Sequence, residues 1–226
     1  MISVNRLHAR FFRPEHGWDP VPEMYAKNYG DNKWKQGTSE ELLKQIDDWV
    51  GGISGKTVLD LGGGPGQYSI AFAELGAKVV WHDVSSFYLN YAKDKALQYN
   101  QDIEFSLGYM DEAPALLTRQ FDFVFNRICW NYCWSDLAFS NIIFDLIARD
   151  GSCYIETNHS DWNRDSLNLY CSIRTYLNDN YALKIGHPFP RHGLLANIFS
   201  QKPISRMYLD YHSLPDKDKI LFQKRG

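Results

Sequence analysis

The sequence predicts an α/β protein with a seven-stranded, mostly parallel sheet, helices on both faces and an antiparallel hairpin at its C-terminal end. Two observations support this prediction. Short apolar runs alternate with helical patterns from residue 57 to about residue 180, and strict alternation of this kind is typical of parallel strands joined by helices. The last two apolar runs are separated by only a few residues around Pro215. A connection that short is too short for a crossover and predicts a hairpin.

Each element has its own local signal. The first regular segment, residues 38–52, is expected to be a helix because Thr38 or Ser39 can cap it, apolar side chains recur on one face, and two glycines end it. The segment before it, residues 1–38, is irregular and rich in proline, glycine and aromatic residues. Strands are expected at residues 57–61, 78–83, 103–108, 121–126, 152–158, 204–214 and 217–225. Helices are expected at residues 68–76, 85–100, 113–119, 135–151 and 165–180.

Length and composition exclude several classes of protein. The 226 residues suffice for one sizeable α/β domain, and the net charge of −3 indicates no basic surface for a nucleic acid. Four cysteines lack paired C-x-x-C spacing, so we expect reduced thiols, no metal site and a cytoplasmic location. No apolar run approaches the roughly 18 residues of a membrane span. The N-terminal segment carries no clear cleavage pattern and is expected to belong to the mature protein.

The glycine-rich stretch after the first strand is the strongest functional signal. Its spacing is Asp60-x-Gly62-x-Gly64-x-Gly66, which differs from the G-x-G-x-x-G pattern of dinucleotide sites. Pro65 removes one N–H from the start of the next helix, where a diphosphate would bind. A carboxylate before the loop repels a diphosphate and suits an ammonium group, while Asp83 ends the next strand and can accept ribose hydroxyls. An adenosyl amino acid without phosphate, S-adenosylmethionine, meets all these requirements.

In these features the sequence resembles the class I S-adenosylmethionine-dependent methyltransferase family, of the small-molecule type. "VLDLGGGPG" is similar to the family's first motif, "VVWHDVS" to its acidic second-strand motif, and the trailing hairpin to its antiparallel terminal strand. The resemblance covers roughly residues 40–226. It implies a Rossmann-like fold and one methyltransferase domain over residues 1–226. Within it, residues 1–38 would form a lid, residues 39–226 the core, and an insertion at about 160–200 the acceptor pocket.

The resemblance also implies where the cofactor binds. Asp60 would lie near the methionine end, and the ribose would be held by Asp83 with Val84 on the adenine face. After the third strand, either Asp111 reaches the adenine with the Met110 amide, or Tyr109 covers the ring; Asp111 could equally cap a helix. Asn126 would line the methionine end. The remaining expected cofactor residues are the loop glycines and two lid aromatics, which could equally be packing residues: Gly62, Gly63, Gly64, Gly66, Tyr25 and Trp34.

Methyl transfer from a sulfonium is an in-line displacement that depends mainly on alignment and exclusion of water. A base is needed only when the acceptor begins protonated. The candidate catalytic residues are Glu156 and His159, at the end of the fifth strand, and His187, in a proline-rich loop. Either histidine could instead be an ordinary loop residue. His82 is expected to be structural because it faces away from Asp83, and Arg127 is expected to pair with an acidic neighbour.

The function expected from these residues is methylation of an oxygen or nitrogen atom of a small molecule. The alternatives are methylation of RNA or protein and non-catalytic binding of S-adenosylmethionine. A nicotinamide dehydrogenase is a further alternative if the glycine loop is misinterpreted. The D-P-P-Y-like tetrad of amino-directed nucleic-acid methyltransferases is missing after the fourth strand, where "NRICW" stands. The expected partner is therefore a small-molecule acceptor, with no nucleic acid or membrane, for a monomer or homodimer.

Overall fold

The computed structural model describes residues 4–161, 169–211, 213 and 215–226. Among them, seven strands form one mixed sheet in the order β3-β2-β1-β4-β5-β7-β6, which confirms the predicted fold class. The chain divides into two compact units. The first unit comprises residues 12–125, and the second unit comprises residues 1–11 and 126–226. Each is described below by itself.

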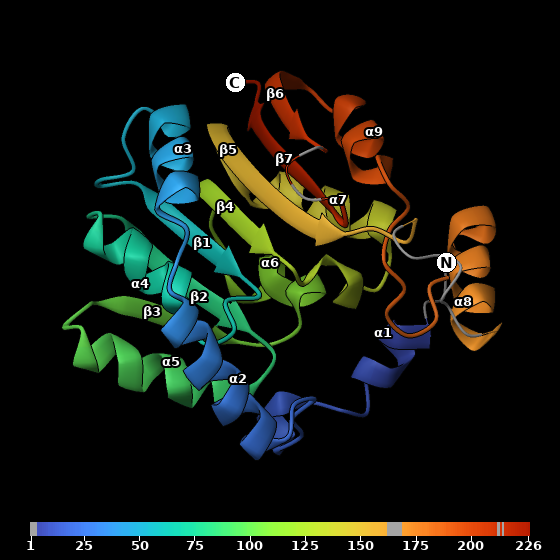
Figure 1. Cartoon of the computed structure of the whole chain (residues 1–226), viewed down its shortest axis with the longest axis horizontal. Coiled ribbons are helices and arrows are strands. Elements are labelled where there is room, and N and C mark those ends of the chain that lie inside the picture. The colour runs from blue at the N-terminus through green and yellow to red at the C-terminus, as the bar shows by residue number, and fades with distance from the viewer. Residues whose placement is uncertain (1–3, 162–168, 212, 214) are drawn as a thin grey trace. The chain divides into compact units, whose positions relative to one another are not determined.

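The first unit holds the parallel part of the sheet, in which β1 lies between β2 and β4 and β3 flanks β2 (Figure 1). Helix α4 packs on β1, β2 and β3, α5 packs on β2 and β3, and α2 packs on α5. Its elements are η1 (Pro14–His16), α2 (Glu23–Gln36), α3 (Glu40–Val50), β1 (Thr57–Leu61), α4 (Gln67–Glu74), β2 (Lys78–Asp83), α5 (Ser86–Gln98), β3 (Ile103–Leu107), η2 (Met110–Glu112), α6 (Ala113–Leu116) and β4 (Phe121–Arg127), the last crossing into the second unit.

Local sequence explains where the helices of the first unit begin. The Ser39 hydroxyl accepts a hydrogen bond from the Leu42 amide and caps α3, and the Ser85 hydroxyl does the same for α5. Buried aromatic rings fill the space between α4 and the sheet. The Phe72 ring meets the Phe125 ring edge to face at a centroid distance of 5.2 Å. Rigid packing of this kind fixes the carboxyl ends of β1 and β2, where the glycine loop begins.

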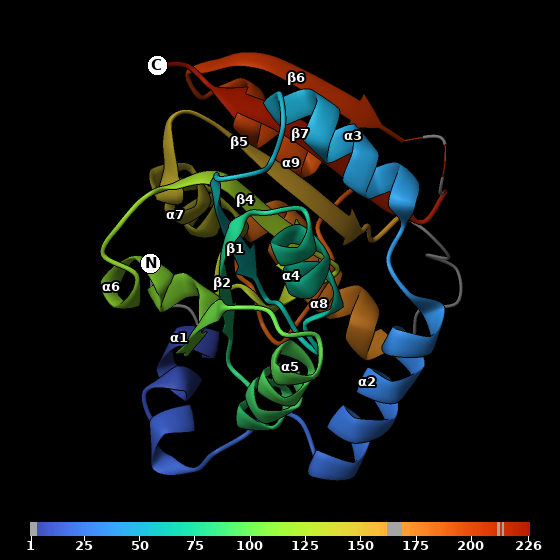
Figure 2. The same ribbon diagram turned by 90° about the vertical axis from the view of Figure 1, so that its left-hand side faces the viewer.

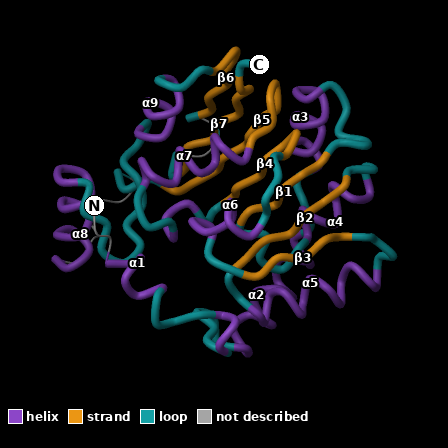
Figure 3. The backbone as a smooth tube through the Cα atoms, turned by 180° about the vertical axis from the view of Figure 1, so that it is seen from behind, coloured by secondary structure: helices purple, strands orange, loops and turns teal. Residues whose placement is uncertain are grey.

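The second unit holds the antiparallel part of the sheet. Strand β7 pairs antiparallel with both β5 and β6, so the expected C-terminal hairpin is confirmed (Figure 3). Helix α7 packs on β5, and α9 packs on β6 and α7. The elements of this unit are α1 (Val4–Ala9), η3 (Trp130–Tyr132), α7 (Asp136–Leu146), β5 (Ile147–Asn158), α8 (Leu169–Tyr181), α9 (Leu194–Ser200), β6 (Ile204–Asp210) and β7 (Lys217–Lys224).

Two boundaries in the second unit differ from the sequence prediction. The helix expected over residues 135–151 ends at Leu146, and β5 begins at Ile147. The Lys224 ammonium donates to the carbonyls of Phe144 and Ile147, both at 2.9 Å, and thereby satisfies carbonyls at the helix end. Helix α9 was not predicted, and residues 1–38, which were expected to be irregular, contain α1 and α2. The first four residues of the helix expected at 165–180, and two near the end of the strand expected at 204–214, lie outside the described residues.

Within the described part of the chain, no helix has both the length and the apolar character needed to cross a membrane.

His82 is buried beside the glycine loop, and its ring contacts one residue on β3 and one in the turn that follows β3. Its Nδ1 lies 2.9 Å from the Ser106 hydroxyl and its Nε2 lies 3.3 Å from the Tyr109 carbonyl oxygen. Burial lowers the pKa of His82 to about 4, so the imidazole is neutral near pH 7. These contacts point away from the ligand side of the loop, as expected from strand alternation.

This buried histidine predicts a pH dependence of stability. The unfolded chain takes up a proton at about pH 6.5 and the folded chain only at about pH 4. Stability from this group is therefore complete above about pH 6.5 and is lost as the pH falls toward 4. We expect the free energy of unfolding to fall by about 2 kcal/mol between about pH 7 and pH 5 because of His82. Urea denaturation of His82→Gln should lack this component, whereas the exposed-site control His16→Gln should keep it.

Candidate cofactor site

The glycine loop connects β1 to α4, and its amides are all used within the protein. The Gly62 and Gly63 amides donate to the His82 carbonyl at 2.7 and 3.1 Å. The Gly64 amide donates to Asp83 Oδ2 at 3.0 Å, and the Gly66 amide donates to the Gly63 carbonyl at 3.0 Å. Binding of a diphosphate needs free backbone N–H groups. The described geometry therefore gives this loop no glycine amide to offer a phosphate.

Glycine is required at these positions for two different reasons. Gly64 and Gly66 have φ values of +50° and +80°, a region that L side chains rarely adopt. At Gly63 the restriction is space, because an added Cβ would lie 2.3 Å from Trp81 Cδ1. The Trp81 indole in turn donates to the Gly64 carbonyl at 3.0 Å. An added Cβ at Gly64 meets no atom within 4 Å, so this glycine faces open space.

Asp83 ends β2 and anchors the loop. Its Oδ2 accepts from the Gly64 amide and its Oδ1 from the Ser85 amide, each at 3.0 Å. Burial raises the pKa of this carboxyl, while the amide hydrogen bonds partly oppose the rise. An ionised carboxylate can accept about four hydrogen bonds. The Val84 backbone also hydrogen-bonds this carboxylate, so one acceptor position remains on Asp83 for a ribose hydroxyl.

Asp60 lies at the end of β1 and is only 4% exposed. The Ser69 hydroxyl on α4 donates to its Oδ2 at 2.5 Å. Asp60 thus links the end of β1 to α4 through its hydrogen bond with Ser69.

The expected lid residues lie on α2, beside α5 (Figure 2). The Trp34 indole donates to the Pro65 carbonyl at 2.9 Å, so α2 is attached directly to the glycine loop. The Lys95 ammonium lies 4.9 Å from the centroid of the Trp34 ring. Tyr25 is 57% exposed and stacks on Tyr29 at a centroid distance of 5.9 Å. Trp34 therefore packs at the loop, while Tyr25 presents its ring to solvent.

Asp19, which precedes α2, is a site residue that sequence reasoning missed. Its Oδ2 accepts from the Ser85 and Ser86 hydroxyls and from the Phe87 amide, at 2.8 to 3.1 Å. These contacts cap α5 directly after Asp83. No local signal marks this role, because Asp19 is separated from Ser85 by 66 positions.

The turn after β3 is covered by the same N-terminal segment. The Tyr109 ring stacks on Trp18 at 6.1 Å, and its hydroxyl donates to the Phe12 carbonyl at 2.7 Å. Met110 is buried at the start of η2, and Asp111 is half-buried within it. Val84, half-buried, follows β2 directly. These adenine candidates therefore lie in the loops that follow β2 and β3, and the Gly108 amide joins the two loops by donating to the Asp83 carbonyl at 2.9 Å.

The candidates at the end of β4 and β5 lie in the second unit. Asn126 is buried, and its amide group donates to Cys129 Sγ at 3.1 Å. Glu156 is 2% exposed, and its Oε2 accepts from the Arg127 guanidinium at 2.8 Å and from the Tyr154 hydroxyl at 2.9 Å. The expected pairing of Arg127 with an acidic neighbour is thus observed. Ile128 follows with a φ of +59°, which is strained for a β-branched residue.

The two candidate histidines have different surroundings. His159 is buried directly after β5, with Nε2 3.1 Å from the Pro215 carbonyl oxygen and its ring 4.6 Å from the His192 ring. His187 is exposed and packs on Tyr132 at a ring distance of 4.8 Å. Although the side chain is exposed, the atoms packed around the ring partly desolvate it, and this desolvation together with the nearby cations of Lys184 and Arg174 lowers the pKa of His187. His159 thus belongs to a cluster with His192, and His187 lies against Tyr132.

Two comparisons with known proteins indicate the class of protein to which this chain is similar. Residues 58–151, which include the glycine loop, Asp83 and β4, match the model of a methyltransferase domain. The fold is shared with a magnesium protoporphyrin IX methyltransferase from Synechocystis solved with bound SAH, at a TM-score of 0.59 and 15% identity over 89% of this chain and 97% of that one. The match assigns a methyltransferase domain to residues 58–151, and the fold is the Rossmann-like fold of the methyltransferases of known structure.

Two curated relatives share part of the sequence. Both are ubiquinone biosynthesis O-methyltransferases. The protein from Nitrosomonas europaea is 30% identical over 109 residues, which cover 48% of this chain and 43% of that one. The protein from Shewanella pealeana is 27% identical over 168 residues, which cover 74% and 65%. The chain thus spans less than two thirds of the length of each relative.

Proposed function

We propose that this protein transfers the methyl group of S-adenosylmethionine to an oxygen or nitrogen atom of a small molecule. One observation carries the proposal: the glycine loop retains no glycine amide for a phosphate, while Asp83 beside it retains an acceptor position. A dinucleotide needs the first, and the ribose of an adenosyl group needs the second. This argues against a nicotinamide dehydrogenase. The open space at Gly64 supports close approach of the cofactor to the backbone.

The roles of the first unit's residues follow from this fit. S-adenosylmethionine would supply an electrophilic methyl group on a positively charged sulfur. Asp83 would hold a ribose hydroxyl, Val84, Met110 and Asp111 would line the adenine, and Asp60 would favour the ammonium end through its negative charge. Trp34 would hold the loop through its hydrogen bond to the Pro65 carbonyl. Helix α2 would act as a lid that excludes water from the cofactor. Alignment of the acceptor with the methyl group then provides most of the rate enhancement.

Deprotonation of the acceptor would fall to the second unit. Glu156 is already engaged, because its Oε2 accepts from both the Arg127 guanidinium and the Tyr154 hydroxyl. His187 keeps a lowered pKa, which weakens it as a proton acceptor. His159 retains a buried Nδ1 that has no hydrogen-bond partner among the described residues. We therefore favour the cluster around His159 as the place where an acceptor proton is removed or its oxygen activated.

The curated relatives favour oxygen over nitrogen as the acceptor atom, because both are named as O-methyltransferases. The acidic composition, with a net charge of −3, supports a small molecule over RNA. We further propose that the chain acts in the cytoplasm as one methyltransferase domain, as a monomer or homodimer.

A methyl-transfer screen tests the reaction. Purified protein would be incubated with S-adenosylmethionine carrying a labelled methyl group and with separate pools of phenols, amines, bulk RNA and unfolded protein. We expect label to move into the phenol pool, with one S-adenosylhomocysteine formed for each methyl transferred. Label in RNA or protein would support the alternative enzymes. Binding of the cofactor without transfer to any pool would support a non-catalytic binding protein.

Gly64→Ala tests where the cofactor lies. The new methyl group would occupy the open space at the loop, so we expect affinity for S-adenosylhomocysteine to fall about tenfold or more, by ~1.4 kcal/mol. The φ of +50° should reduce the free energy of unfolding by about 1–2 kcal/mol. Gly55→Ala is the matched control, because Gly55 also has a positive φ and open space but lies outside the loop. Equal affinities in the two variants would place the cofactor elsewhere.

A further inference from the structure

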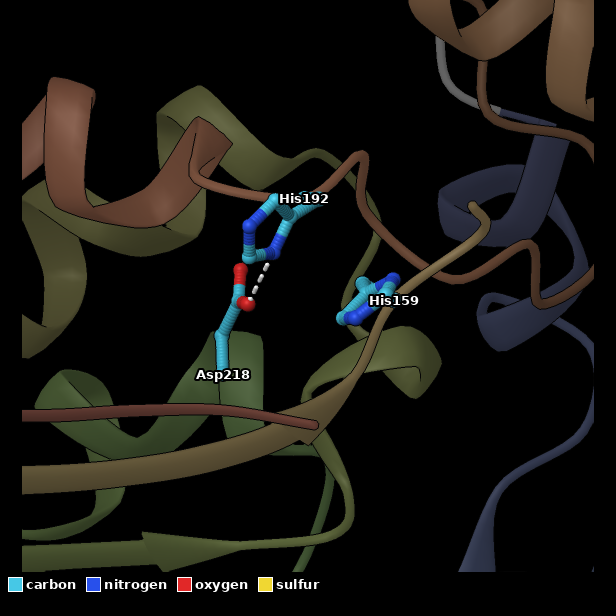
Figure 4. Close-up of side chains that lie close together, drawn as sticks. All are labelled: His159, His192 and Asp218. Atoms are coloured by element: carbon cyan, nitrogen blue, oxygen red, sulfur yellow. Dashed lines mark hydrogen bonds and ion pairs between the residues drawn. The ribbon is translucent and has the colours of Figure 1, made fainter. Parts of the chain in front are cut away.

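Three ligand-type side chains converge in the second unit. His159 directly follows β5, His192 lies just before α9, and Asp218 lies near the start of β7. Each offers one nitrogen or oxygen atom, and these atoms all lie within 4.8 Å of one another. Figure 4 shows the Asp218 carboxylate and the two imidazole rings gathered at one point between the strands and the loop before α9. The methyltransferase resemblance assigns no such cluster, and the cysteine spacing predicted no metal site.

The hydrogen bonds of His159 leave one of its two ring nitrogens without a partner among the described residues. Its Nε2 lies 3.1 Å from the Pro215 carbonyl oxygen. A carbonyl only accepts, so Nε2 carries the proton and Nδ1 of the neutral ring is an unprotonated nitrogen. The side chain is 8% exposed, and Nδ1 has no hydrogen-bond partner in the described part of the chain. An imidazole that donates one N–H to a carbonyl and leaves the other nitrogen bare has the arrangement of a metal ligand.

Asp218 is a buried carboxylate, and no lysine or arginine among the described residues forms an ion pair with it. It is fully buried, its Oδ1 lies 2.6 Å from His192 Nδ1, and its Oδ2 accepts from the Gly193 amide at 2.8 Å. Among the described residues, Asp218 forms an ion pair with His192 alone. A buried carboxylate is stable only when its charge is compensated. A divalent cation at this point would compensate that charge and satisfy His159 Nδ1 together.

We propose that His159, His192 and Asp218 bind a divalent transition-metal ion, with zinc as the best fit. Two imidazoles and one carboxylate form a donor set that suits zinc and neighbouring metals. On binding, the ion replaces the proton between His192 and Asp218. Bonds of about 2.0–2.2 Å in a tetrahedral site place the ligand atoms roughly 3.4 Å apart. His192 would therefore move away from Asp218, and the more distant ligand atoms would come closer by roughly 1 Å, a shift to which the exposed His192 side chain can contribute. His192 is 41% exposed, so a further coordination position is open to a water molecule.

This site also has a place in the reaction, a step that rests on the proposed function. An acceptor hydroxyl bound at the open position would lose its proton more easily, because a cation stabilises the oxyanion. The proton leaves to solvent, and the oxygen becomes a stronger nucleophile toward a methyl donor. Metal binding itself is independent of the cofactor residues of the first unit, so the two proposals can be tested separately.

The test is a titration of the full chain, freed of metal by a chelator, with zinc chloride in a calorimeter. We expect one ion bound per chain, and a Co²⁺ titration should give the visible absorption of a nitrogen- and oxygen-ligated site. His159→Ala and His192→Ala should each lower zinc affinity about 100-fold or more. The control His16→Ala removes an exposed histidine of the first unit and should bind zinc as the unmodified chain does.

Folding and cofactor binding are measured on the same samples. Circular dichroism and the affinity for S-adenosylhomocysteine should be unchanged in His192→Ala, which alters a partly exposed side chain. Zinc binding that is equally tight in His192→Ala and in the control would overturn the proposal. The absence of zinc binding by the unmodified chain would overturn it as well, and a pH–rate profile altered by His159→Ala would then assign His159 as a general base. If the unmodified chain does not bind S-adenosylhomocysteine, that result would instead contradict the proposed function.

Discussion

Lys184→Met is expected to lower the free energy of unfolding by about 3–5 kcal/mol, because it leaves a buried charge without its partner. The Lys184 ammonium is fully buried and donates to Asp136 Oδ1 at 2.7 Å and to Cys133 Sγ at 3.1 Å. Asp136 also accepts from the Trp130 indole at 2.9 Å and from Asn178 at 3.2 Å. Burial opposes ionisation of Asp136, yet Lys184 and these donors hold its pKa below the usual value. Guanidinium denaturation monitored by circular dichroism measures the loss.

Two further variants separate the buried charge from the loss of a lysine side chain. Lys27→Met removes the partner of Asp31 in an exposed pair on α2, and solvent screening makes the contribution of such a pair small. Asp136→Asn added to Lys184→Met removes the isolated charge but keeps an acceptor for Trp130, so we expect it to recover part of the stability. A loss in Lys184→Met no greater than in Lys27→Met would show that the buried ion pair contributes little.

Asp83→Ala is expected to lower the affinity for S-adenosylhomocysteine about 100-fold or more. A hydrogen bond from a ribose hydroxyl to a carboxylate would be lost, at roughly 1.5–3 kcal/mol. The Gly64 and Ser85 amides would also lose their acceptors, which loosens the loop. Asp83→Asn keeps one acceptor oxygen and should give an intermediate affinity. Isothermal titration calorimetry measures all three proteins.

The control for this series is Asp94→Ala, on the exposed face of α5. It changes the net charge by the same amount and should leave the affinity unchanged. If Asp83→Ala and Asp94→Ala bind S-adenosylhomocysteine equally well, the ribose does not lie against Asp83.

Local patterns were sufficient to predict most of the sheet. The expected strands at residues 57–61 and 78–83 coincide with β1 and β2, because short apolar runs ending in glycine or a capping serine set their own limits. The end of α7 could not be predicted this way. It depends on Lys224, whose ammonium reaches the carbonyl of Phe144 from 80 positions away, and no local rule contains that contact.

The same distinction applies to the candidate sites. The glycine loop and Asp83 are close in sequence and follow two adjacent parallel strands, so their proximity could be expected. Asp19 and the cluster of His159, His192 and Asp218 are brought together by segments far apart in the chain. The sequence indicated His159 as one catalytic candidate but did not indicate its partners. The fold shows that His159 lies beside a second imidazole and a buried carboxylate.

The most direct test of the central claim is a pair of calorimetric titrations of the unmodified chain, one with S-adenosylhomocysteine and one with NAD. A loop whose glycine amides are all bonded within the protein should bind S-adenosylhomocysteine in the micromolar range and should not bind NAD. Tight binding of NAD with none of S-adenosylhomocysteine would mean that the loop holds a diphosphate, in contradiction to the geometry described.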